Sequence, residues 1–420
     1  MNWIMNILII TFILLGLIKE TFSQTGADAK ALKEKIFVTD GYDYKIRPQQ
    51  NQSAPIDVYI NFYLLAINEL SEVTETLKTT GYLWILWQDD FLQWNASDYG
   101  NLWQYFWPQG DVWRPDIALK NSFTDYKALG VDTLNVMVES TGHVQWYPFQ
   151  VFQSTCAVDI TYYPYDIQTC KLEFVAWSYS KAEVNLMSGA KGIDLWEYES
   201  NSEWEVLDTN YTTEAMTYEA QIVFTIKIQR KPTYVLLSVI MPIIMLAILN
   251  IAVFLLPCES GEKASYAVTV FLAFAVFLSI ISSTLPENSD TIAVFSMYLI
   301  ILTLESTLIT LTALVLIRVS TFDQDGTPVP RLLMTGLNFL TCKSCCCKKK
   351  NKVKDKKDED DIWSINKTTI EEIPCDDETK PEGTWRDVVN AFDKIFFIFY
   401  ILVLAVSTVV FFVVVSTNKG

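Results

Sequence analysis

Four long apolar runs restrict the fold of this chain more than any other feature of its sequence. The runs cover residues 234–256, 264–285, 291–317 and 395–415. About 20 apolar residues are enough for a helix to cross a bilayer, so each run is predicted to be a transmembrane helix. Three runs are grouped within residues 232–317, and the fourth follows a polar segment at 318–394. The pattern therefore predicts a protein of the lipid bilayer, with three spans followed by one.

The N-terminal part of the chain indicates which side of the membrane it occupies. Residues 1–23 hold a short apolar stretch followed by small and polar residues, which is typical of a secretory signal peptide. An uncleaved anchor helix is the alternative. Residues 24–231 would then lie outside the cell, at the plasma membrane. They also contain the predicted glycosylation sites Asn51, Asn95 and Asn210.

The segment 318–394 carries the basic cluster "CKSCCCKKKNKVKDKK" soon after the third span. Basic residues beside a span are typical of the cytoplasmic side, which is also where this arrangement of spans places the segment. Most of it lacks apolar periodicity and is predicted to be flexible, but "TWRDVVNAFDKIFF" has helical spacing and leads into the last span. The cysteines of the basic cluster, at 342, 345, 346 and 347, are expected to be either acylated or plain thiols. Residues 416–420 are expected outside the cell.

Residues 24–231 alternate apolar and polar side chains over short stretches such as "DVYINFYLL", "TLNVMVES" and "QIVFTIKIQ", with turn residues between them. Alternation with a period of two is typical of half-buried strands. The segment is long enough to bury a sizeable core. It is therefore predicted to be an all-β, immunoglobulin-like sandwich.

Cys156 and Cys170 are the only cysteines within residues 24–231, and thirteen residues separate them. In an oxidising extracellular setting, these two are expected to form a disulfide. The loop that they close contains the sequence Tyr163-Pro164-Tyr165-Asp166. Two aromatic rings around a proline predict a rigid turn that presents the rings and one carboxylate at its tip. An ordinary structural hairpin is the alternative.

The second apolar run carries hydroxyl groups on one helical face. Steps of four and three residues bring one stripe together: Ser265, Thr269, Leu272, Val276, Ser279 and Ser283. Hydrogen bonds to another helix could satisfy one or two of these hydroxyls. A stripe along the whole helix instead favours a water-filled pore formed by several copies of the chain. Leu272 and Val276 would then form a hydrophobic constriction that closes by dewetting.

Two carboxylates lie at the cytoplasmic start of this stripe, Glu259 and Glu262. A single carboxylate at a membrane boundary costs little and proves little. Repeated around a symmetric ring, however, it would concentrate permeating cations at the mouth of the pore. These residues therefore predict a cation-selective channel.

Several motifs together resemble those of the Cys-loop pentameric ligand-gated ion channels, in the branch of the nicotinic acetylcholine receptors. They are the disulfide loop with "YPYD", "WQDDFLQWN", "WRPDI", "WSY", "RKP" before the first span and "GEK" at the start of the second. The resemblance covers essentially the whole mature chain. It implies five subunits, alike or mixed, and a pore lined by the second span. It also implies a small-molecule agonist that binds between extracellular domains. The sequence "SGEK" at the start of the second span resembles that of the cation-conducting members of the family.

The resemblance also implies which residues form the agonist site. On the principal face, Trp177 matches the central tryptophan, next to Tyr179, and Tyr211 and Tyr218 are candidate aromatic caps. A cation–π contact is the role implied for Trp177; a tryptophan of the sandwich core is the alternative. The matching positions on the complementary face are Tyr82, Trp84, Met137, Gln145 and Tyr147.

Two departures from the family pattern argue against acetylcholine as the agonist. Lys120 stands where nicotinic principal faces have tyrosine, and a cation there repels a quaternary ammonium unless an acid compensates. The loop before the last extracellular strand lacks the adjacent pair of cysteines found in acetylcholine-binding subunits. Two interpretations remain. One is a receptor that resembles the cephalopod chemotactile receptors and is retuned for other ligands, including hydrophobic ones. The other is an accessory subunit of a heteromer.

Gating is expected to depend on residues near the membrane. The Tyr163–Asp166 tip, Arg230 before the first span and Pro286 after the second are the candidates, and Glu72 or Glu75 is the expected partner of Arg230.

Other classes of function find no support in the sequence. The net charge is −17, which argues against nucleic acid as a partner. His143 is the only histidine. We therefore expect no metal site, no cofactor and no catalytic constellation. A non-conducting adhesion or scaffold protein would not need the hydroxyl stripe.

Overall fold

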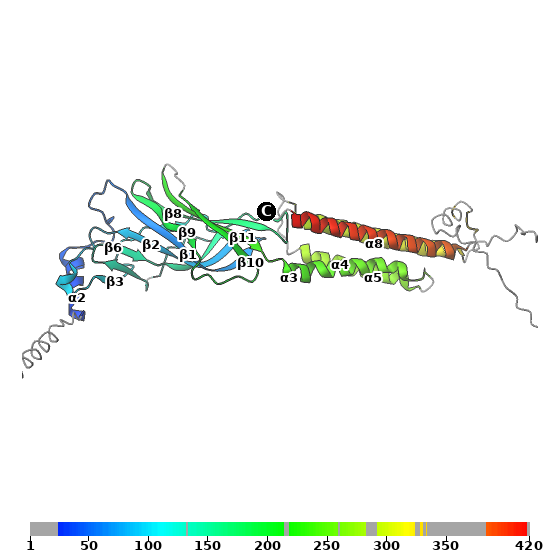
Figure 1. The fold of residues 1–420 in the computed structure, drawn as a ribbon, viewed down its shortest axis with the longest axis horizontal. Coiled ribbons are helices and arrows are strands. Elements are labelled where there is room, and N and C mark those ends of the chain that lie inside the picture. Colours follow the sequence, from blue (N-terminus) through cyan, green and yellow to red (C-terminus); the bar gives the residue numbers. More distant parts are fainter. Residues whose placement is uncertain are drawn as a thin grey trace, which may run out of the picture. The chain divides into compact units, whose positions relative to one another are not determined.

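The structure, a computed structural model, describes residues 24–131, 133–213, 218–258, 261–282, 292–323, 328–330, 333 and 384–417. These residues form two compact units, one of strands up to Pro232 and one of helices from Thr233 onward. Each unit is described by itself below (Figure 1).

The first unit opens with a short helix and continues as two sheets. Helix α2 (Gly26–Glu34) begins at Thr25, whose side chain and that of Asp28 cap each other's backbone N–H groups. The larger sheet has seven strands in the order β3-β5-β6-β2-β1-β9, with β7 also paired to β2. The smaller sheet has four strands in the order β10-β11-β8-β4. The strands of the two sheets are visible in Figure 1.

The bounds of the strands in the larger sheet are β1 Ile56–Ser71, β2 Thr76–Gln88, β3 Gln104–Pro108, β5 Asn135–Glu139, β6 His143–Trp146, β7 Phe149–Thr155 and β9 Val184–Asp194. Those in the smaller sheet are β4 Ile117–Leu119, β8 Ile167–Ser180, β10 Trp204–Thr212 and β11 Glu219–Arg230. Strands β1 and β9 pair in parallel, while β1–β2 and β8–β11 pair antiparallel.

The core of this unit lies between the two sheets. Phe62 and Phe152 project from the larger sheet, and Phe174 and Phe224 project from the smaller one. Their rings meet edge to face, with centroids 5.4 Å apart for Phe152–Phe174 and 5.9 Å apart for Phe174–Phe224. Apolar side chains at every second position of β1 from Ile56 to Leu64 are buried in the same way. The prediction of an extracellular all-β domain is confirmed.

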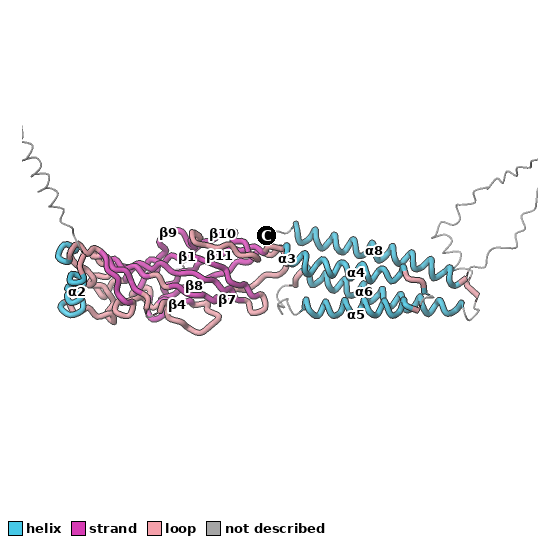
Figure 2. The backbone as a smooth tube through the Cα atoms, turned by 90° about the horizontal axis from the view of Figure 1, so that it is seen from below, coloured by secondary structure: helices cyan, strands magenta, loops and turns pink. Residues whose placement is uncertain are grey.

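The second unit contains four helical segments long and apolar enough to cross a membrane: Thr233–Leu255, Glu262–Ser282, Val294–Ser320 and Trp385–Thr417. The first comprises α3 (Thr233–Val235), a π-helical turn, α4 (Met241–Ile251) and a final 3-10 turn. The others are α5, α6 and α8, and Figure 2 shows these helices running side by side. The chain is thus a multi-pass membrane protein.

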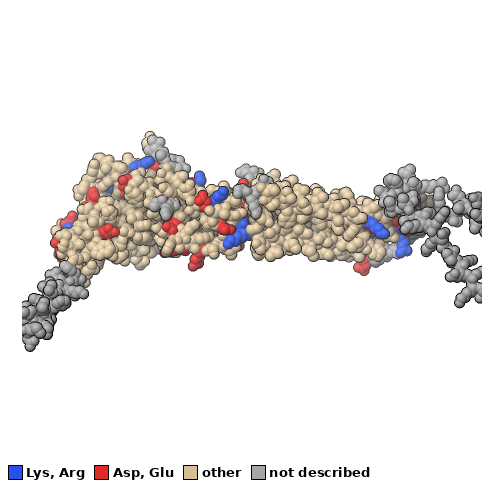
Figure 3. All heavy atoms as spheres, in the orientation of Figure 1, with Lys and Arg blue, Asp and Glu red and all other residues tan. Residues whose placement is uncertain are grey.

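The observed helices differ from the predicted spans at their ends. Helix α5 begins at Glu262 and not at 264, and α6 runs from Val294 to Ser320 and not from 291 to 317. Helix α8 begins at Trp385, ten residues before the predicted span at 395, because the segment "WRDVVNAFDK" continues the same helix. Figure 3 shows that the middle of the helical unit presents almost no charged side chains on the visible face.

Candidate functional site

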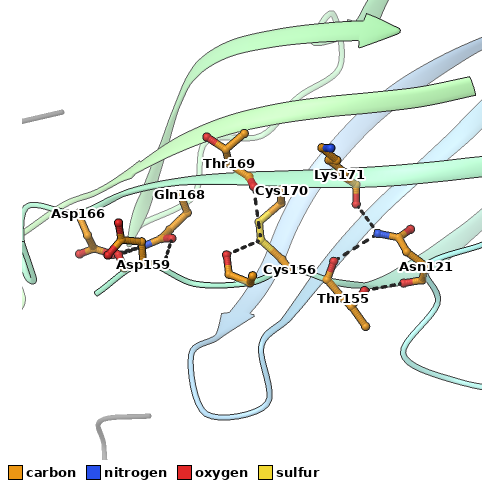
Figure 4. The surroundings of a disulfide bond; sticks show 10 residues. Asn121, Thr155, Cys156, Asp159, Asp166, Gln168, Thr169, Cys170 and Lys171 are labelled. Atoms are coloured by element: carbon orange, nitrogen blue, oxygen red, sulfur yellow. Dashed lines mark hydrogen bonds between the residues drawn. A yellow bond between two sulfur atoms is a disulfide. The ribbon is translucent and has the colours of Figure 1, made fainter. Parts of the chain in front are cut away.

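The disulfide between Cys156 and Cys170 is present, as predicted, with a Cα–Cα distance of 5.1 Å (Figure 4). Hydrogen bonds hold the loop that it closes. The Gln168 side-chain nitrogen donates to an Asp166 carboxylate oxygen at 2.7 Å and to the Asp159 carbonyl at 2.8 Å. Asn121 donates to the Lys171 carbonyl at 2.9 Å, which ties the strand after the loop to the chain beyond β4. These hydrogen bonds, together with the disulfide, hold the loop in one defined conformation.

The sequence correctly predicted a turn at Tyr163 and Pro164 but misplaced the carboxylate of Asp166. The Tyr163–Pro164 peptide bond is cis. Asp166 does not project from the tip, because its side chain is 1% exposed and lies against Arg230. The Arg230 side chain donates from Nε to Asp166 Oδ1 at 2.8 Å and from Nη2 to Oδ2 at 3.2 Å. This two-point geometry is the strongest that a guanidinium and a carboxylate can adopt.

Arg230 has three further neighbours. Its Nη2 also forms an ion pair with Glu72, as predicted, whereas Glu75 lies in the β1–β2 turn with a positive φ of 50°. The guanidinium lies 4.3 Å from the ring centroid of Trp204 and 5.0 Å from that of Tyr163. Burial raises the pKa of Tyr163 to about 12. Arg230, Asp166, Glu72, Tyr163 and Trp204 are called the arginine cluster below.

Two residues predicted for the principal face, Trp177 and Tyr179, lie near the end of β8. Trp177 is 61% exposed, so it is not a tryptophan of the core. Its backbone N–H donates to the Asp116 carbonyl, and its ring lies 5.7 Å from that of Tyr126. Tyr218 is also exposed, and its carbonyl accepts from the Lys181 backbone N–H at 3.1 Å. Tyr179 instead packs its ring 6.3 Å from Trp113.

Tyr211 does not join this group. It pairs with Phe224 of β11, whose own partner on β8 is Leu172, five positions before Trp177. Its ring lies against Gly192 of β9, where an added Cβ would stand 3.5 Å from it. Strand β10 is the edge of its sheet, so β11 separates Tyr211 from β8. In this structure, β11 thus lies between Tyr211 and the strand that carries Trp177.

The charge of Lys120 has a partner that the sequence did not identify. Lys120 Nζ lies 2.6 Å from Glu219 Oε2 and 3.4 Å from Gln221 Oε1, both on β11. Gln221 in turn donates to Glu173 of β8 at 3.2 Å. The condition that an acid compensates Lys120 is met.

The aromatic residues predicted for the complementary face form a cluster on β1, β2 and the chain after β6. Trp84 stacks on Tyr147 with centroids 6.1 Å apart, and Tyr82 stacks on Tyr63 at 4.8 Å. The Tyr147 hydroxyl donates to Gln145 at 2.8 Å, and Gln145 is the cross-strand neighbour of Met137. Tyr63 was missed by the sequence reasoning, although its alternation with Asn61 and Tyr59 on β1 placed it on this face.

A groove of about 720 Å³ opens beside this cluster, lined by Tyr63, Trp84 and Asp194 among other residues. Burial, together with the carboxylates of Asp194 and Glu197, raises the pKa of Tyr63 above its usual value. The groove therefore combines aromatic rings with negative charge, which suits an organic cation.

The two aromatic sets belong to different sheets. Trp177 and Tyr218 lie on β8 and before β11, whereas Tyr82 and Trp84 lie on β2. No ring contact among the described residues joins the two sets. The two aromatic sets are therefore separate within one copy of the chain.

The stripe on α5 faces away from the chain's own helices. Five of its six members are described and all are exposed: Ser265, Thr269, Leu272, Val276 and Ser279. The buried residues of α5 are Lys263, Ala267, Phe274 and Ile281, on other positions of the helix. The Thr269 hydroxyl donates to the Ser265 carbonyl of its own helix at 2.7 Å. Glu262 is exposed at the start of α5.

Some predicted residues lie outside the described part of the chain: residues 1–23, Glu259, Ser283, Pro286 and the cysteines at 342–347. The three predicted glycosylation sites are described and exposed, at Asn51, Asn95 and Asn210. Within the described residues, no group of three or more histidine, cysteine, aspartate or glutamate side chains could hold a metal ion.

A β-sandwich with an aromatic face on each sheet, followed by four membrane helices, defines a class of receptor. The chain matches the family model of the neurotransmitter-gated ion-channel ligand-binding domain over residues 29–232, and that of the transmembrane region over residues 239–380. The chain belongs to the neurotransmitter-gated ion channels, in their nicotinic-receptor-like part. This is a family of ligand-gated channels and not of enzymes.

Three relatives show how close the similarity is. The acetylcholine receptor subunit epsilon of Xenopus laevis is 32% identical over 73% of this chain and 64% of its own length. The human neuronal acetylcholine receptor subunit alpha-3 is 32% identical over 64% of this chain and 54% of its own. The acetylcholine receptor subunit beta-type acr-3 of Caenorhabditis elegans is 32% identical over 67% and 58%. The chain spans about half to two thirds of the length of these relatives.

Proposed function

We propose that this chain is one of five subunits of a ligand-gated cation channel in the plasma membrane, with the β unit and the C-terminus outside the cell. The observation that carries the proposal is the exposed stripe on α5. Its hydroxyls and its Leu272–Val276 waist point away from the chain's own bundle, so another surface or water must meet them. Five copies around an axis would bring the stripes together on one aqueous path.

In this arrangement, the same helix would provide both the ion selectivity and the gate of the channel. Five copies of Glu262 would attract cations and repel anions at the cytoplasmic mouth. The exposed side chains of Leu272 and Val276 would form apolar rings in the path, and a narrow apolar ring excludes water when closed.

Cysteine accessibility tests the pore. Leu272→Cys is expected to react with a charged, water-soluble thiol reagent in the activated channel and to lose current. Ile281→Cys, on a buried face of the same helix, is the matched control and should not react. If neither Leu272→Cys nor Ser265→Cys reacts with the reagent, in resting or in activated channels, the stripe does not line a pore.

For the agonist, we propose a site between Trp177 of one subunit and the Tyr82–Trp84–Tyr147 cluster of the next. Since these sets lie on different sheets of one copy, two copies are needed to enclose a ligand. The missing pair of adjacent cysteines favours a ligand other than acetylcholine, whereas the charge of Lys120 is compensated by Glu219. Exposed rings at Trp177, Tyr126 and Tyr218 favour an amine or a poorly soluble hydrophobic compound, as in a chemotactile receptor.

Glu219→Gln is expected to lower the sensitivity to a cationic agonist by about 2- to 5-fold, because the partly exposed pair with Lys120 is worth at most about 1 kcal/mol. Dose–response curves under voltage clamp measure the change. Adding Lys120→Met to the same chain removes the unpaired cation and should restore sensitivity. If the double variant stays as insensitive as Glu219→Gln, charge at Lys120 does not control agonist binding.

An accessory subunit of a heteromeric nicotinic receptor is the second candidate, supported by the similarity to named acetylcholine receptor subunits. Expressing the chain alone separates the two. Current evoked by amines, terpenoid-like or bitter compounds, without any other subunit, would support the receptor. Current only together with an acetylcholine-binding subunit would support the accessory role.

A further inference from the structure

Helix α5 begins with two adjacent residues of opposite charge, which differ in burial. Gly261 turns the chain with a φ of 68°, and Glu262 and Lys263 follow it. Glu262 is exposed, whereas Lys263 is completely buried. A buried ammonium is stable only with a close partner, because removing a lone charge from water costs several kcal/mol.

The partner of Lys263 comes from the last helix. Lys263 Nζ lies 2.5 Å from Asp393 Oδ1, and the Asp393 side chain is only 8% exposed. The Cys258 sulfur lies 3.4 Å from the ammonium and 3.9 Å from the second carboxylate oxygen. The ring of Phe254 lies 5.8 Å from the ammonium and stacks on Tyr400 of α8. The end of the first span, the start of α5 and α8 thus meet around one ion pair.

This ion pair affects the net charge at the start of α5. A lysine beside Glu262 would offset its carboxylate if the ammonium returned to water, because the two would then lie within a few ångströms of each other at the same mouth. With Asp393 in place, the ammonium is neutralised inside the bundle and does not offset the exposed carboxylate of Glu262.

We propose that Asp393 is a positioning residue for charge selection: by holding Lys263 inside the bundle, it keeps the ammonium from offsetting the carboxylate of Glu262 at the cytoplasmic mouth of the pore. The inference rests on the proposed function, since it requires that Glu262 faces the path of the ions. It adds a residue of α8, which does not line the pore, to the determinants of selectivity.

Asp393→Asn tests the inference in the full-length channel. It is expected to lower the single-channel cation conductance by about twofold or more at low ionic strength, and to shift the reversal potential toward less cation selectivity. The double variant Lys263→Met with Asp393→Asn removes the ammonium altogether and is expected to restore the conductance. A merely structural role of Asp393 predicts no such restoration of ion selectivity.

Two comparisons complete the design. Asp387→Asn makes the same chemical change at an exposed position of α8 and should leave conductance unchanged. Glu262→Gln should lower conductance by itself. If Glu262→Gln lowers the conductance, and Asp393→Asn channels that reach the cell surface conduct normally, the inference is wrong and the proposed function stands. If neither variant changes conductance, the proposed charge filter at Glu262 fails.

Low surface expression of Asp393→Asn does not end the test. Co-expression with the unmodified chain gives mixed pentamers, in which each variant copy should lower the single-channel amplitude by one discrete step. A single amplitude equal to that of the unmodified channel, with variant chains detected at the surface, would overturn the inference.

Discussion

Arg230→Ala is expected to destabilise the β unit by about 3–5 kcal/mol and to remove most of the channel from the cell surface. The reason is the carboxylate of Asp166, which is almost completely buried and would lose its two-point partner. Glu72 and the rings of Trp204 and Tyr163 would lose the same cation. A loss of this size is a large part of the total stability of a domain. Antibody binding to an extracellular tag on intact cells measures the surface fraction.

Matched substitutions separate charge from geometry in the arginine cluster. Arg230→Lys keeps the charge but cannot donate two parallel hydrogen bonds, so an intermediate loss is expected. Arg230→Met combined with Asp166→Asn removes both buried charges and should recover part of the surface expression. For copies that reach the surface, single-channel recording reports gating. Normal surface expression and normal gating of Arg230→Ala would show that the cluster neither stabilises the domain nor takes part in activation.

Trp177→Ala is expected to reduce sensitivity to the channel's agonist by roughly 30-fold or more, without loss of surface expression. The ring is mostly exposed in the single chain, so its removal leaves no cavity in the core. A desolvated cation–π contact is worth about 2 kcal/mol, which corresponds to that change in affinity. The measurement is the dose–response curve for any agonist found by screening the chain.

Two further tryptophan variants provide the controls. Trp177→Phe keeps an aromatic face and should lose less than the alanine variant. Trp146→Ala should act differently, because Trp146 is buried and donates to Gln109 at 3.1 Å, so its loss is expected to reduce folding. An unaltered dose–response curve for Trp177→Ala would show that the agonist does not bind at the aromatic face that carries Trp177.

Local pattern was sufficient to predict the architecture. A period of two along β1 and β11 is a property of the extended backbone itself, so alternation identified the strands. Length and hydropathy identified the membrane helices, because the bilayer imposes both. The disulfide followed from counting cysteines in one compartment. The stripe on α5 also required only helical spacing, since residues three and four apart share a face in any α-helix.

Prediction was weaker where the position depended on a neighbouring strand. Tyr211 is a candidate cap of the agonist site by resemblance, and the sequence did not show that β11 separates its strand from that of Trp177. Tyr126 and Tyr63 were missed, although each packs on a residue that was predicted. Sequence patterns determine which side of a strand a residue occupies, and they leave open which strand lies next to it.

The sequence by itself determined which residues are apolar, which segments are strands or helices, and which faces carry charge or hydroxyls. Only the tertiary structure decided the partners of the buried and half-buried charges: Asp166 for Arg230, Glu219 for Lys120 and Asp393 for Lys263. The physical reason is that such a pair forms between residues 64, 99 or 130 positions apart. Their distance is set by the packing of sheets and helices, and no local rule of spacing reaches that far.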